Sequence, residues 1–157
     1  MSWLPRRADG ADDFARAFGL RPNLFDAWRD FEALLWRDGR LDPVLLELCR
    51  RRLAEMNGAA LLPGTPGPTL DPAKLAELPR WWKSERFTPL EKACLRFAEQ
   101  FALDPKQIGD ADARAVTDAL GDAGTVAFVE ALAIYDGITR FAAMLGLGSS
   151  TRDGARA

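Results

Sequence analysis

Residues 41–58 read LDPVLLELCRRRLAEMNG and carry the clearest helix signal in the chain. Asp42 followed by Pro43 is a typical helix start, because the aspartate side chain caps free backbone N–H groups and proline fits the first helical position. Asn57-Gly58 is a typical helix end. Between them, one face collects the residues spaced by three and four, which are Leu45, Leu48, Cys49, Arg52, Leu53 and Met56. The stretch therefore predicts an amphipathic helix with a buried face.

Helical patterns with their own start and end signals lie on both sides of this stretch. They cover Asn23, as the capping residue, to Trp36, Asp71 to about Leu78, a helix opened by Thr88-Pro89, Asp110 to about Leu120, and Thr125 to Leu145. Gly121 is expected to break the chain between the last two. The segment LPGTPGP, residues 62–68, cannot be regular helix. No alternating strand pattern competes, so we expect an all-α bundle of about six helices, with 42–56 and 125–145 central.

The composition fits one globular domain spanning residues 1–157. Hydrophobic residues make up 48% of the 157 residues, which is enough for a core. The 21 lysines and arginines nearly balance the 23 aspartates and glutamates, which argues against a nucleic-acid partner. No apolar run reaches the roughly 18 residues of a membrane helix and no secretory signal is found, so we expect no membrane partner and a cytoplasmic location. Residues 1–20 are expected to be a loose arm and residues 148–157 a flexible tail.

Histidine is absent, and its absence excludes several kinds of site. No Ser-His-Asp or Cys-His pair can be built, and the usual histidine-rich zinc sites are excluded. The two cysteines, Cys49 and Cys94, are far apart in sequence, and each lies on the apolar face of its helix. We therefore expect both in the core. The sequence predicts neither a metal nor a cofactor, and acid–base chemistry would fall to Asp, Glu, Lys, Tyr or Cys.

Three segments resemble the AhpD-like/carboxymuconolactone decarboxylase superfamily in order and spacing, over about Pro22 to Leu147. Residues 41–58 look like that family's core helix, and residues 82–91, WKSERFTPLE, look like the entry to its next helix. Residues 133–141, AIYDGITRF, followed by Leu145-Gly146, are similar to its last helix, which often reads Tyr-Asn-x-x-Asn-Arg. Within the superfamily, the chain resembles the peroxidase-related branch. The resemblance implies an all-helical protein that self-associates.

The resemblance also locates the family's redox motif and shows that it is missing. Peroxidase-type members carry a glutamate, a Cys-x-x-Cys pair beginning twelve residues later, and a histidine four residues after the second cysteine. Glu47 holds the first place, but the cysteine places fall on Ala59 and Leu62 and the histidine place on Pro66. Alanine and leucine cannot supply the thiolate and the resolving thiol, and proline cannot relay a proton. The family's decarboxylase-type members use histidine chemistry, which is absent as well.

Individual residues favour structural roles over catalytic ones. We expect Glu47 to pair with Arg51, four residues on, in preference to acting as a proton relay. Arg52 is expected to pair with Glu47, Glu55 or an acid of a neighbouring helix in preference to binding an anion. Tyr135, the only tyrosine, is expected to make a buried hydrogen bond within the protein. If a ligand pocket remains, its candidate residues are Glu47, Arg52, Tyr135, Asp136 and Arg140.

Three functional hypotheses follow. The first is a non-catalytic protein that kept the family's fold, lost its redox site, and binds a small apolar ligand or serves in an assembly. The second is an enzyme of the family, either an alkylhydroperoxidase or peroxiredoxin-type antioxidant or a decarboxylase-like enzyme, with a site relocated to Glu47, Asp136, Tyr135 or Arg140. The third is a thiol peroxidase that uses Cys49 or Cys94, which requires an exposed, acidic thiol.

The aromatic content predicts a homo-oligomer. Five tryptophans and nine phenylalanines are many large groups for this length, and the helix from Pro22 to Trp36 has an apolar arc wider than one contact requires. Surplus apolar surface usually marks an interface, and a dimer, a trimer or a higher ring would cover it. Alternatively, the arm from Met1 to Leu20 folds back over this surface.

Overall fold

The computed structural model describes residues 12–59 and 67–147. Within these ranges all regular elements are helical: α1 (Asp13–Phe18), α2 (Pro22–Arg37), α3 (Pro43–Met56), α4 (Pro72–Glu77), the 3-10 helix η1 (Leu78–Lys83), α5 (Pro89–Leu103), the 3-10 helix η2 (Pro105–Gln107) and α6 (Asp110–Met144). The predicted all-α class and the predicted number of helices are confirmed. None of these helices is long and apolar enough to cross a lipid bilayer.

Short-range capping signals in the sequence set most helix starts. The Asp42 carboxylate accepts a hydrogen bond from the Val44 amide at 2.8 Å at the start of α3. At the start of α5, Thr88 and Glu91 form a reciprocal capping box, with distances of 3.2 and 2.8 Å. Each of these caps is followed by a proline at the first helical position. The predicted starts of these two helices are therefore confirmed.

The start of α2 corrects one prediction. Asn23 was expected to cap this helix, but the helix begins at Pro22, and the capping position belongs to Arg21, whose side chain makes no capping bond. The reason is the fixed φ of proline, which suits the first helical position and so places Asn23 inside the helix.

A bend at Gly121 divides α6 into two parts. The backbone there has φ +67° and ψ 176°, a left-handed conformation that only glycine adopts readily. In the part before the bend, Asp112 forms an ion pair with Arg96 on α5 at 2.8 Å. The predicted break at Gly121 is confirmed, and the helix after it ends beside Gly146, which also has a positive φ.

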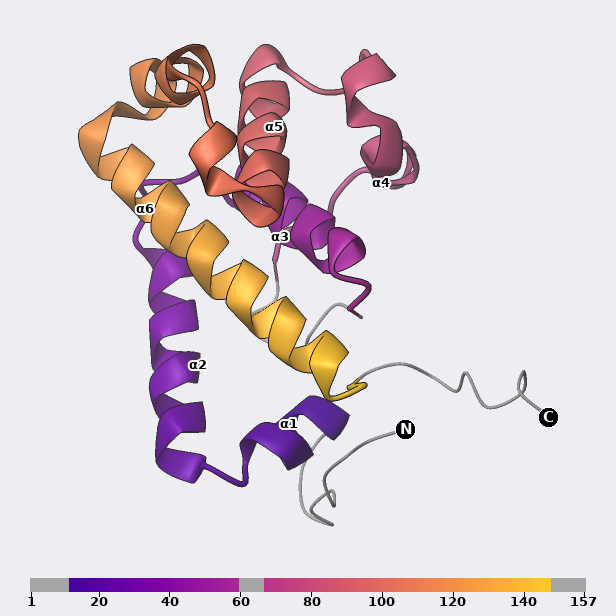
Figure 1. The fold of residues 1–157 in the computed structure, drawn as a ribbon, viewed down its shortest axis with the longest axis vertical. Helices are drawn as coiled ribbons and strands as arrows, with labels where there is room; N and C mark the ends of the chain where they lie inside the picture. The colour runs from indigo at the N-terminus through magenta and orange to yellow at the C-terminus, as the bar shows by residue number, and fades with distance from the viewer. Residues whose placement is uncertain (1–11, 60–66, 148–157) are drawn as a thin grey trace, which may run out of the picture.

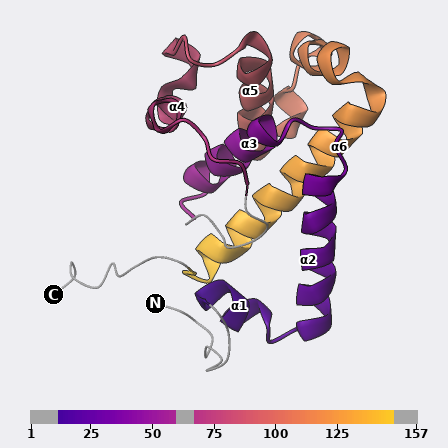
Figure 2. The same ribbon diagram turned by 180° about the vertical axis from the view of Figure 1, so that it is seen from behind.

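Helices α3, α5 and α6 form the centre of the molecule, and α2 lies along the outer side of α6, away from α4 (Figures 1 and 2). The fully buried side chains of the core include Leu48, Leu53, Leu95 and Phe128. The first half of α3 is buried on all sides, from Leu45 to Arg50. Because other parts of the molecule cover this half of α3 on every side, its charged residues Glu47 and Arg50 are buried as well.

Helix α1 corrects the expectation of a loose arm for residues 13–18. Phe14 is only 3% exposed and packs edge-on against Phe18, Phe25 and Trp28 of α1 and α2 and against Phe141 near the end of α6. This part of the arm therefore folds back over Phe25 and Trp28 of α2, while Leu24, Phe31 and Leu34 of the same helix stay exposed. The rest of the arm, residues 1–11, and the tail, residues 148–157, lie outside the described residues.

Candidate functional site

Glu47 is a buried carboxylate held by two arginines of its own helix. Its side chain is 1% exposed. Oε2 accepts a hydrogen bond from Arg50 Nε at 2.8 Å, and Oε1 accepts one from Arg51 Nε at 2.6 Å. A carboxylate this deeply buried needs such partners, because an unpaired buried charge is very costly. The predicted pair with Arg51 is present, and Arg50 is a second partner that was not predicted.

Aromatic rings and a second acid surround this ion pair. The Arg50 guanidinium lies 5.4 Å from the ring centroid of Trp36 and 5.9 Å from that of Tyr135. The Trp36 indole N–H in turn donates to Oε1 of Glu32 at 2.8 Å, and Glu32 is itself 2% exposed. We call this group the Glu47 cluster; it comprises Glu32, Trp36, Glu47, Arg50, Arg51 and Tyr135.

Tyr135 enters the Glu47 cluster with its hydroxyl group unpaired. The residue is 3% exposed, and by distance and angle its hydroxyl has no hydrogen-bond partner among the described residues, because the indole N–H of the nearby Trp36 donates to Glu32 instead. The predicted buried bond is therefore not found. Burial raises the pKa of the phenol well above its ordinary value, and the nearby Glu32 raises it further. The phenol therefore stays protonated at neutral pH and can only act as a hydrogen-bond donor or acceptor.

Asp136 and Arg140 belong to a different contact, at the end of α3. Asp136 accepts hydrogen bonds from Asn57 Nδ2 at 2.9 Å and from Arg140 Nε at 2.8 Å. Arg140 also donates to the carbonyl oxygen of Ala102 at 2.6 Å. These bonds tie the ends of α3 and α5 to α6, which is a structural role.

Arg52 also lies in a structural contact, on the side of α3 that faces α5. It forms ion pairs with Glu55 at 2.7 Å and with Glu99 of α5 at 2.6 Å, as expected of an arginine paired with a neighbouring acid. The same oxygen of Glu99 accepts the Trp81 indole N–H at 2.7 Å. Of the five predicted pocket residues, Glu47 and Tyr135 therefore meet in the Glu47 cluster and Asp136 and Arg140 meet at the end of α3, while Arg52 joins neither pair.

Sequence reasoning missed Glu32, Trp36 and Arg50 as members of this site. One signal was available, since Glu32 is an acid between Trp28 and Leu35 on an apolar stripe of its helix, where an acid needs a partner. The partner itself depends on how α2 packs beside α3, which periodicity does not reveal.

Ala59, one of the expected cysteine positions, is half-buried in apolar surroundings. It packs against the cluster formed by Phe14, Ala142 and Leu147. Leu62 and Pro66, the other two expected motif positions, lie outside the described residues.

The two cysteines lie in the core, as expected. Cys49 is 1% exposed and Cys94 is fully buried. Burial raises the pKa of the Cys94 thiol to about 12, and burial together with the nearby Cys94 raises the pKa of Cys49 well above its ordinary value. Neither thiol is therefore an exposed or acidic nucleophile. Among the described residues, no group of three His, Cys, Asp or Glu side chains is placed to hold a metal ion.

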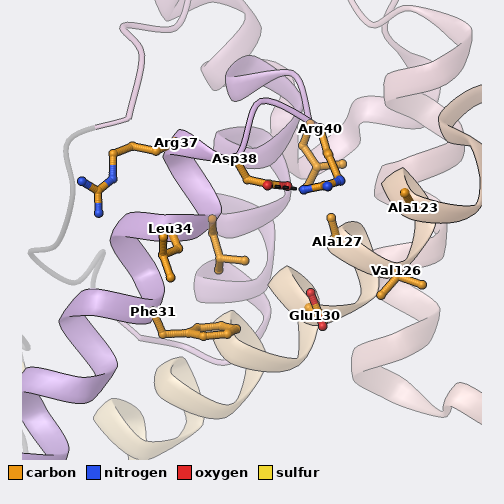
Figure 3. A pocket seen from close by; sticks show the side chains of 11 residues that line it. Phe31, Leu34, Arg37, Asp38, Arg40, Ala123, Val126, Ala127 and Glu130 are labelled. Atoms are coloured by element: carbon orange, nitrogen blue, oxygen red, sulfur yellow. Dashed lines mark hydrogen bonds and ion pairs between the residues drawn. The ribbon is translucent and has the colours of Figure 1, made fainter.

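A surface groove runs between the second half of α2 and the part of α6 after Gly121 (Figure 3). Its volume is about 570 Å³. Its walls are mostly apolar, with Phe31 and Leu34 on α2 facing Ala123, Val126 and Ala127 on α6, and Glu130 is its one acid on the α6 wall. We call it the α2–α6 groove. It is separate from the Glu47 cluster, and sequence analysis did not locate it.

Comparison with known proteins connects this chain to others through its fold. No known family model matches the sequence, and no curated protein matches it. The structure is similar to the crystal structure of a protein of unknown function from Agrobacterium tumefaciens, described as a suggested antioxidant defence protein, AhpD. The similarity covers 83% of this chain and 92% of that one, with a TM-score of 0.71 and 17% sequence identity. The chain therefore has an AhpD-like helical fold, as the sequence resemblance implied.

Proposed function

We propose that this protein keeps the AhpD-like fold without its thiol redox chemistry, and that it acts by binding a small apolar ligand or as a subunit of an assembly. The main support for the proposal comes from the contacts of the Glu47 carboxylate. By resemblance, this residue holds the place of an acid that works with two cysteines and a histidine. Here each of its two oxygens accepts a hydrogen bond from an arginine, so the carboxylate is held in two ion pairs.

The burial of both cysteines supports the same proposal. A peroxide-reducing thiol must be ionised and reachable by its substrate. Cys49 and Cys94 are both buried in the core, and burial raises the pKa of each. The near-balance of charge further supports a role without a nucleic-acid partner.

A peroxidase assay tests the proposal. Purified protein is mixed with an alkyl hydroperoxide and a dithiol reductant, and peroxide consumption is followed. We expect the rate to equal that of the reaction without protein, and the rates of the Cys49→Ser and Cys94→Ser variants to be the same. A turnover that disappears in either variant would overturn the proposal and establish a thiol peroxidase.

A second candidate is an enzyme of this fold with a relocated site, either antioxidant or decarboxylase-like. The unpaired Tyr135 hydroxyl beside Glu47 and Arg50 favours it, because a buried donor without a partner is ready to bind a ligand atom. This candidate requires a turnover that the cysteine variants retain and that Tyr135→Phe loses.

A further inference from the structure

The side of α2 that borders the α2–α6 groove carries a row of exposed apolar residues with the spacing of a coiled-coil seam. Leu24, Ala27, Phe31 and Leu34 follow one another at steps of three, four and three, and all four are exposed. Leu24 is 53% exposed and Leu34 is 58% exposed. This spacing places the row on one stripe of the helix, where a second helix packs knobs into holes. The row thus fits a helix as its partner.

The α2–α6 groove gives this stripe a second wall. Phe31 and Leu34 belong to both the stripe and the groove, and the facing residues Ala123 and Ala127 are small. Small side chains allow the axis of an added helix to approach closely. Val126, on the same wall, is 58% exposed. A helix lying in the groove would therefore bury apolar surface of α2 and α6 at once.

Charged residues beside the stripe identify the occupant. Asp30 and Arg37 lie seven residues apart on the same flank of the stripe, and both are exposed. Among the described residues neither makes an ion pair, and Arg37 Nε donates only to the carbonyl oxygen of Ala33, in its own helix. If a second α2 lies antiparallel with Phe31 opposite Leu34, then Asp30 of each copy lies opposite Arg37 of the other. The same surface is thus complementary to itself in shape and in charge.

We propose that the α2–α6 groove is the interface of a two-fold dimer, in which α2 of a second copy packs antiparallel against α2. Phe31 of each copy lies against Leu34 of the other, and two Asp30–Arg37 ion pairs close the rim. A two-fold axis requires a surface that matches itself, and this register supplies one. The inference rests on the assembly role proposed above and gives it a location.

Light scattering of the full chain at micromolar concentration provides the first test. We expect a mass of about twice the 17.3 kDa of one chain. Leu34→Glu places a charge in the centre of the interface and should give the mass of one chain. The matched control is Leu103→Glu, since Leu103 is 74% exposed at the end of α5, outside the groove, and this variant should remain a dimer.

A charge exchange tests the register. Asp30→Arg and Arg37→Asp should each weaken the dimer, raising its dissociation constant on the order of tenfold, because each creates two like-charge pairs. The double variant restores both pairs with reversed signs and should recover the original constant. Circular dichroism of each variant checks that the helices are intact.

The outcomes separate this interface from the proposed function. If Leu34→Glu still has the mass of a dimer, the proposed interface is wrong. The same holds if the double variant does not recover the dissociation constant of the wild type. In both cases the protein still self-associates, but through another surface. A wild-type chain that is a monomer overturns both the interface and the assembly role. In that case the groove would be free for a small apolar ligand. A fluorescent apolar probe should then bind to the wild type and fail to bind to Leu34→Glu.

Discussion

Gly67 lies directly against the carboxylate of Glu47. A Cβ atom at position 67 would come within 2.6 Å of Oε2 and 2.8 Å of Cδ of Glu47, and within 3.0 Å of the Trp36 ring. The carboxylate cannot move aside without breaking its bonds to Arg50 and Arg51. The segment after the loop therefore covers the buried ion pair with a residue that has no side chain.

Gly67→Ala should destabilise the protein by about 1–3 kcal/mol, the usual cost of forcing an extra group into a packed site. Gly137→Ala is the control, because Gly137 is helical and has open space around its Cβ position. That variant should be more stable than wild type by up to about 1 kcal/mol. Urea denaturation measures both, and equal stabilities for the two variants would contradict the contact.

Glu47→Gln should cost about 3–5 kcal/mol of unfolding free energy, because it leaves the buried Arg50 guanidinium without its counter-charge. Glu55→Gln, on the same helix, is the matched control. The Glu55 side chain is 41% exposed, so its ion pair with Arg52 is screened by water, and the variant should lose less than about 1 kcal/mol. A similar small loss in both variants would mean that the Glu47 pair contributes no more than a surface pair.

Tyr135→Phe should leave the stability unchanged or raise it by up to about 1 kcal/mol, since the change removes a buried hydroxyl that has no partner among the described residues. Thermal and urea unfolding report this directly. A clear loss of stability would show that the hydroxyl is bonded after all, to water or to a ligand, and would strengthen the case for a relocated site.

Stability should fall as the solution becomes alkaline. The ordinary pKa of the Cys94 thiol is 9.0, and burial raises it to about 12 in the folded protein. Between these values the unfolded chain releases the proton and the folded chain keeps it, so the contribution is full below pH 9 and is lost as pH rises towards 12. The expected slope for this thiol is about 1.4 kcal/mol per pH unit.

The control for this pH effect is Cys94→Ala. Its unfolding free energy, measured in urea at several pH values, should decrease less steeply than that of wild type, whatever its stability at neutral pH. Identical slopes would mean that the thiol ionises equally well in the folded protein.

Local signals made the main helices predictable, because their starts depend on side chains a few residues away. Asp42 and the Thr88–Glu91 box cap the helices that follow them, and Gly121 bends the chain because its backbone is left-handed. Helix α1 has a capping aspartate too, but with six residues it gains its stability from contacts such as that of Phe14 with Phe141. Such contacts between distant segments leave no periodic trace in the sequence.

The site was predictable only in part for the same reason. The pair of Glu47 with Arg51 follows from helix geometry, since residues four apart share a face. The approach of Trp36 and Tyr135 to Arg50 brings three helices together, and no spacing along one of them encodes it. The α2–α6 groove likewise depends on the placement of α2 beside α6.

The contact between Phe14 and Phe141 places the beginning and the end of the described chain side by side, with their ring centroids 6.2 Å apart. A linker that joins the two ends of the described chain would therefore close it into a ring. New ends could be opened in the exposed turn around η2, where Pro105–Gln107 lies outside the core. The bundle thus has the geometry of a protein that tolerates circular permutation.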